Sequence, residues 1–91
     1  MRNYRLVVML KGDMDKAARE KVLSDVSGYI GKTEKLTTDV MGEKKLAYPV
    51  RGAQKADYVV MKFGAEELSP ELKSRLEMNE SVLRHLLVRD N

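Results

Sequence analysis

The sequence contains no cysteine and no tryptophan, and only one histidine, one phenylalanine and two prolines occur among its 91 residues. Without cysteine there is no disulfide framework and no thiolate metal site, so we expect no metal and no cofactor. No apolar run approaches the roughly 20 residues that a membrane-spanning helix needs. Strand-like residues follow almost directly on the first methionine, so we expect no signal or transit peptide. These absences favour a cytoplasmic protein.

The residues that are present describe a single small globular domain over residues 1–91. Hydrophobic residues make up 43% and charged residues 34% of the chain, a balance typical of a folded rather than a disordered protein. A chain of this size buries roughly 60–65% of its unfolded surface, which is enough for one thin core. The net charge of +3 permits an anionic partner but does not require one.

Hydrophobic periodicity predicts four strands and two helices. The strands are expected at residues 4–10, 33–41, 57–63 and 82–88. Pairing of the second strand can resume over 46–48 after a bend at Gly42, and residues 49–55 are expected to connect it to the third. The first helix is expected to begin at Asp13 or Asp15 and to stop at Gly31. The second begins at Ser69-Pro70 and ends near Asn79, because serine caps a helix and proline is tolerated in its first turn.

This order of elements predicts an α+β fold, the ferredoxin-like βαββαβ sandwich, with two helices on one face of a four-stranded antiparallel sheet. Two helices cover only one face, yet the strands carry apolar residues on both faces. A protein partner would explain an apolar open face, although small domains also expose ordinary apolar area. Our candidate partner-protein contacts are Val7, Met9, Tyr58 and Val60. The pattern leaves open whether Tyr58 and Val60, or Val59, Met61 and Phe63, face outward.

Signals for an enzyme are weak, and we expect no catalytic residues. His85 is the only histidine, and a lone histidine in a strand is more often packed or solvated than catalytic. Acylphosphatase-type catalysis would need a phosphate cradle with an arginine between the first strand and helix. Here Asp13 and Asp15 would repel a phosphate. A ligand-sensing or protein-interaction module remains an alternative, by analogy of fold alone.

Binding of RNA is better supported, through basic side chains rather than through bases stacked on the sheet. The third strand lacks the aromatic Gly-Phe/Tyr-Gly-Phe type of sequence that RNA-recognition motifs carry. Cations at strand ends and in the stretch 42–55 suit phosphate and ribose, although a solvated turn rich in lysine is the alternative. We expect the start of the first strand, the hairpin arm and the last strand to converge. The candidate RNA contacts are Arg2, Tyr4, Lys44, Lys45, Tyr48, Arg84 and Arg89.

Four segments resemble one family, the bacterial ribosomal small-subunit protein six (bS6). Residues 45–50, Lys-Leu-Ala-Tyr-Pro-Val, resemble its Arg/Lys-x-Leu-Ala-Tyr-Pro-Ile segment. Residues 55–61, Lys-Ala-Asp-Tyr-Val-Val-Met, resemble its Lys-Ala-x-Tyr-Val-Leu-Met strand. Residues 79–84, Asn-Glu-Ser-Val-Leu-Arg, resemble its turn into the last strand, and Tyr4 followed by an apolar strand resembles its opening. The likeness spans almost the whole chain in the right order.

The resemblance implies a structural constituent of the small ribosomal subunit. It implies binding to the central domain of 16S rRNA together with ribosomal protein bS18, with no membrane and no small-molecule substrate. Such a partner protein would explain an apolar open face or an exposed strand edge. Arg5 departs from the family, which often has an acidic residue there, so contacts with the partner are expected to differ locally.

Overall fold

The computed structural model describes residues 2–12 and 14–89. Six elements follow one another along the chain, in the predicted order. They are β1 (Arg2–Lys11), α1 (Lys16–Ile30), β2 (Glu34–Val50), β3 (Ala53–Ala65), α2 (Leu72–Met78) and β4 (Val82–Arg89).

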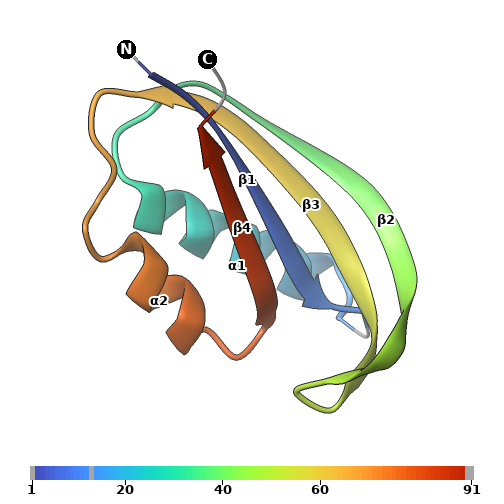
Figure 1. Cartoon of the computed structure of the whole chain (residues 1–91). Coiled ribbons are helices and arrows are strands. Elements are labelled where there is room, and N and C mark those ends of the chain that lie inside the picture. Colours follow the sequence, from blue (N-terminus) through green and yellow to red (C-terminus); the bar gives the residue numbers. More distant parts are fainter. Residues whose placement is uncertain (1, 13, 90–91) are drawn as a thin grey trace.

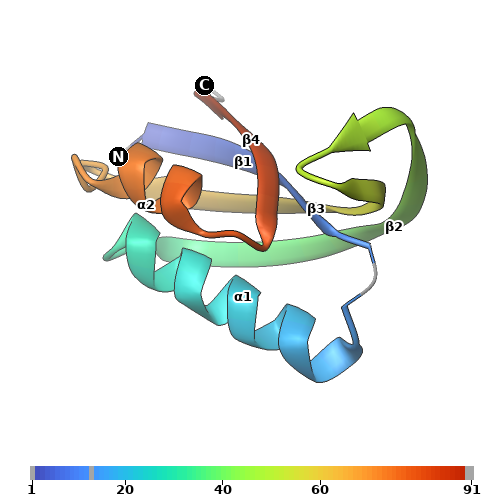
Figure 2. The ribbon, with the colours of Figure 1, turned by 90° about the horizontal axis from the view of Figure 1, so that it is seen from below.

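The strands form one four-stranded sheet in the order β2-β3-β1-β4, and all three neighbouring pairs are antiparallel. The helices pack on one side of this sheet, with α2 beside α1 (Figures 1 and 2). The predicted ferredoxin-like sandwich is therefore confirmed, including the central place of β1 beside the last strand.

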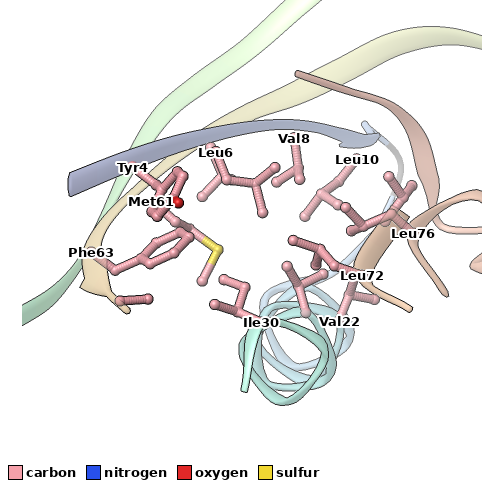
Figure 3. Packing of buried hydrophobic residues seen from close by; sticks show 14 residues of the cluster. Tyr4, Leu6, Val8, Leu10, Val22, Ile30, Met61, Phe63, Leu72 and Leu76 are labelled. Atoms are coloured by element: carbon pink, nitrogen blue, oxygen red, sulfur yellow. The ribbon is translucent and has the colours of Figure 1, made fainter. Parts of the chain in front are cut away.

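The core lies between the helices and one face of the sheet (Figure 3). Alternate residues of β1 point into it, because side chains of a strand alternate between faces. From β3 the core takes Val59, Met61 and Phe63, so the choice that the sequence left open is settled: Tyr58 and Val60 face the other way. From the helices it takes Val22, Val26, Ile30, Leu72 and Leu76.

Helix α1 begins where the sequence predicts. The carboxylate of Asp15 accepts a hydrogen bond of 2.8 Å from the backbone N–H of Ala18, which satisfies a donor that the first turn leaves unpaired. The alternative cap, Asp13, lies outside the described residues. Gly31 follows the last turn with φ of 89°, a positive angle that glycine adopts without steric cost.

The hairpin of β2 and β3 is longer than the sequence predicts. The expected connection over residues 49–55 is wrong: β2 continues to Val50, β3 begins at Ala53, and only Arg51 and Gly52 form the turn. Pro49 is tolerated because β2 is an edge strand and Pro49 lies in the irregular stretch between Lys45 and Val50, where the pairing with β3 shifts. The predicted bend is present, since the register shifts between Val40 and Gly42.

Helix α2 is shorter than predicted. It begins at Leu72 after Glu71, and the Ser69-Pro70 pair forms the preceding turn instead of the first helical turn. In that turn Ser69 accepts two hydrogen bonds, from the N–H of Glu71 to its hydroxyl and from the N–H of Leu72 to its carbonyl. Asn79 ends the helix as predicted, with its N–H bonded to the carbonyls of Arg75 and Leu76.

Candidate RNA and protein interface

The centre of the open sheet face is apolar. Val7 lies directly opposite Val60, and Met9 lies directly opposite Tyr58, on the two central strands. All four predicted partner contacts therefore form two adjacent cross-strand pairs on the face without helices. Leu86 extends this apolar centre onto β4, where it lies opposite Val7 and is 60% exposed. Each side chain is shielded on its flanks by its neighbours but uncovered from above.

Cations flank this apolar centre towards the hairpin. Arg84 lies opposite Met9, which continues the row formed by Tyr58 and Met9 across the sheet. On the other side, the ammonium of Lys44 lies 5.3 Å from the centroid of the Tyr58 ring, within the range of a cation–π contact. This row thus combines an aromatic ring, a thioether and one cation, and Lys44 reaches it from the next row, opposite Ala56. Such a composition suits RNA as well as protein.

Two further cations flank the apolar centre on its opposite side. Arg5 lies directly opposite Lys62, and Val88 completes the row on β4. Like charges placed opposite one another are unfavourable in an isolated sheet. A hollow of about 380 Å³ spans these strands, and its lining includes Arg5, Lys62 and one carboxylate, that of Asp39. The departure from the family pattern at Arg5 therefore falls on the open face itself.

The predicted RNA contacts do not converge on one site. Arg2 lies at the level of Ala65 of β3, whereas Lys44 lies at the level of Ala56. Nine residues of strand separate these levels, which is about 30 Å at roughly 3.3 Å per residue. The start of β1 and the end of β4 lie at one end of the sheet, and the tip of the β2–β3 hairpin lies at the other (Figure 1).

Apart from Tyr4, the predicted RNA contacts instead form two groups. The hairpin group comprises Lys44, Lys45, Tyr48 and Arg84, and the terminal group comprises Arg2 and Arg89. Lys44 and Lys45 are neighbours on a strand and so face opposite sides of the arm. Tyr48 is 63% exposed, so its ring does not pack under the hairpin.

The prediction for Tyr4 requires a correction. Its ring lies in the core, 9% exposed, and stacks on Phe63 with 5.7 Å between the ring centroids (Figure 3). It shares its face of β1 with Leu6 and Val8, so the strand alternation points it at the helices. A ring held there cannot stack on a base or a ribose without opening the core.

Sequence reasoning gave Arg51 no specific role. Its guanidinium donates hydrogen bonds of 3.3 Å to the carbonyls of Glu77 and Val82, which lie at the end of α2 and the start of β4. It therefore ties the hairpin turn to a distant part of the chain. In the sequence, Arg51 was only one of the cations of the stretch 42–55, because local patterns do not show contacts between residues 26 and 31 positions apart.

No group of three or more histidine, aspartate or glutamate side chains in residues 2–12 and 14–89 is placed to hold a metal ion. In the same part of the chain, no helix is both long and apolar enough to cross a membrane.

Comparisons with known proteins agree with one another. The family model described as Ribosomal protein S6 matches residues 3–89. The chain is 37% identical over 90 residues to the small ribosomal subunit protein bS6 of Clostridioides difficile strain 630, which covers 97% of this chain and 98% of the relative. It is 33% identical over 95 residues to the protein of the same name from Natranaerobius thermophilus, covering 99% and 97%.

Among solved structures, the crystal structure of 30S ribosomal protein S6 from Thermotoga maritima matches with a TM-score of 0.80 and 22% identity. The match covers 98% of this chain and 87% of that one. At this identity, the likeness establishes the shared fold.

Proposed function

Because this chain belongs to the ribosomal protein S6 family, we propose that it is a structural constituent of the small ribosomal subunit in the cytoplasm. It binds the central domain of 16S rRNA together with ribosomal protein bS18, and it catalyses no reaction. The relatives that cover nearly the whole chain are named as small-subunit proteins, which supports this assignment.

The observation that carries the proposal is the composition of the open face. The pairs Val7–Val60 and Met9–Tyr58 form an apolar centre that the chain itself leaves uncovered. Cations from all four strands surround this centre. A surface with an apolar middle and a charged rim has the usual anatomy of a protein interface. The partner protein covers the apolar middle, and the surrounding cations remain available to phosphates.

We place the main RNA contact at the hairpin group. Lys44, Lys45 and Tyr48 project from an arm that extends beyond the helices, and Arg84 adds a cation on the neighbouring part of β4. Phosphate contacts of this kind fix position without reading sequence. Arg2 and Arg89 form a second, smaller contact at the other end of the sheet.

The test is a titration of the protein against the 16S central domain, with and without bS18, at several salt concentrations. One variant carries Lys44→Gln and Lys45→Gln, and a second carries Arg2→Gln and Arg89→Gln. The matched control carries Lys16→Gln and Lys21→Gln, which removes two exposed lysines from α1, away from the sheet face. Each phosphate contact that is lost should lower the salt slope of binding by about 0.7–0.9.

We expect the hairpin variant to lose more affinity and more salt slope than the terminal variant, and the control to match the wild type. If all three variants retain the wild-type slope, RNA contacts a different surface. If the folded wild-type protein binds neither RNA nor bS18, the ligand-sensing alternative is favoured over a ribosomal role.

A further inference from the structure

A cavity of about 310 Å³ lies between the hairpin turn and the end of β1, outside the interface described above. Its lining comes from two places in the chain. Lys11 and Gly12 contribute one side, and the turn with the first residues of β3, from Arg51 to Lys55, contributes the other. Three of these residues are cations and none is an acid. The volume is at the lower end of the range for sites that bind small ligands.

The chain is built so that the two sides of this cavity touch. The N–H of Gly12 donates a hydrogen bond of 3.0 Å to the carbonyl of Lys55. A Cβ at position 12 would lie 2.7 Å from the Cβ of Lys55 and 2.8 Å from its carbonyl carbon, closer than real side chains approach. Glycine is therefore required at position 12, and it brings two lysine-bearing segments into contact.

The turn brings a third cation to the same place at a conformational cost. Arg51 has φ of 48° and Gly52 has φ of 80°. Glycine adopts such an angle freely, but a residue with a Cβ is strained there. Arg51 lines the cavity, and its guanidinium is fixed by hydrogen bonds to the carbonyls of Glu77 and Val82.

Like charges also gather around this cavity in the part of the chain that the structure describes. Lys45 lies directly opposite Lys55 in the β2–β3 ladder, an unfavourable pairing of like charges. Glu43 offsets it through an exposed ion pair with Lys55 at 3.5 Å, the one ion pair that Lys55 makes within residues 2–12 and 14–89. Exposed pairs of this kind are weak, so the lysine is free to exchange its partner. The carboxylate of Asp15, which would repel a phosphate placed at the start of α1, accepts the N–H of Ala18 there and does not line this cavity.

We propose that this cavity binds one phosphate group of the RNA backbone, held by Lys11, Arg51 and Lys55. The inference rests on the proposed function, since it takes the phosphate to be supplied by the 16S central domain. Lys55 faces the helix side of the hairpin arm, whereas Lys11 lies opposite Ala56, in the same row as Lys44, and faces the open side. The cavity therefore lies where the two faces meet at the end of β1.

The first arm of the test uses the isolated protein and inorganic phosphate. Amide resonances in a ¹H–¹⁵N spectrum are followed during the titration, with chloride at matched ionic strength as the reference. We expect saturable shifts confined to the amides of Gly12, Gly52 and Gln54. These shifts should be absent from the double variant Lys11→Gln, Lys55→Gln and retained in Lys16→Gln, Lys21→Gln. Uniform weak shifts in all three proteins would overturn the cavity as an anion site.

The second arm measures RNA binding by the same double variant in the presence of bS18. Loss of one phosphate contact should lower the salt slope by about 0.7–0.9 and the affinity by about three- to tenfold at 0.1 M salt. Thermal unfolding checks that the variant is folded. If phosphate binds but the slope equals that of the control, the cavity takes free phosphate and not RNA, and the proposal is overturned. If wild-type protein fails to bind RNA, the proposed function fails, while the phosphate titration still reports on the cavity.

Discussion

The two faces of β1 carry similar side chains but hold them in different surroundings. Leu6, Val8 and Leu10 point at the helices and have no exposed surface. Val7 and Met9, which alternate with them, point the other way and remain half-buried. The same kind of residue therefore serves stability on one face and is available for binding on the other. The two faces differ in that helices α1 and α2 cover one of them and not the other.

The open face is tolerable in the isolated protein because its apolar side chains shield each other. Directly opposed residues on antiparallel strands lie close enough to bury their flanks. The surface that remains uncovered is a source of binding free energy, at about 25 cal/mol for each Å² of apolar area that a partner removes from water.

The largest effect we expect is on the covered face. Leu6→Ala should lower the free energy of unfolding by about 2–5 kcal/mol, because it removes a fully buried side chain and leaves a cavity. Val7→Ala, its neighbour on the open face, should cost about 1 kcal/mol, since that side chain is half-exposed. Chemical denaturation of both variants measures the difference. Equal losses of unfolding free energy in the two variants would contradict the difference in burial between the two faces of β1.

The second prediction concerns the open face. Tyr58→Ala should weaken binding to bS18 by about 2 kcal/mol, or roughly 30-fold, because a central aromatic residue is a typical anchor of an interface. Its effect on the free energy of unfolding should be smaller than that of Leu6→Ala. Isothermal titration of the folded variant with bS18 gives the first value. An unchanged affinity would place the partner on another surface.

A smaller effect is expected at the helix that covers the core. Asp15→Ala should lower the free energy of unfolding by about 1 kcal/mol through loss of the capping hydrogen bond. Affinity for bS18, measured well below the unfolding temperature, should not change because α1 lies on the opposite face. Asp15→Asn, which keeps a capping oxygen, should retain most of the stability. A loss of affinity would mean that the two faces are coupled.

The smallest effect is expected at His85, which lies on the helix side of β4 beside Val8 but at the edge of the sheet. His85→Gln should change the free energy of unfolding by less than about 0.5 kcal/mol and RNA affinity by less than about twofold. Denaturation and the ternary titration test the two quantities separately. A large fall in affinity with unchanged stability would give this residue a direct role in binding.

Local patterns in the sequence predicted most of the fold. The alternation of β1 gave its two faces, the Asp15 cap gave the start of α1, and Asn79 gave the end of α2. The length of the hairpin could not be read in this way. Residues 42–50 are mostly polar or exposed, and they form a strand only because β3 offers them a partner. Tertiary context overrides local propensity most readily in such edge segments.

The candidate site was predicted residue by residue but not as an arrangement. The sequence proposed the cations and the apolar residues. It could not separate the hairpin group from the terminal group, because the distance between them depends on the strand lengths and the register, which only the structure gives. Tyr4 was misplaced for a related reason. It was proposed because the start of the first strand was expected to converge with the hairpin arm, whereas the alternation set by Leu6 and Val8 directs its ring into the core.

By itself, the sequence determined the order of elements, the family and the two-sided apolar character of the sheet, because these depend on local periodicity and on motifs within short segments. Only the tertiary structure decided which face the helices cover, how far the hairpin extends, and that Lys11, Arg51 and Lys55 meet around one cavity. The physical reason is that strand register and close backbone approach, such as that of Gly12 to Lys55, join residues far apart in the chain.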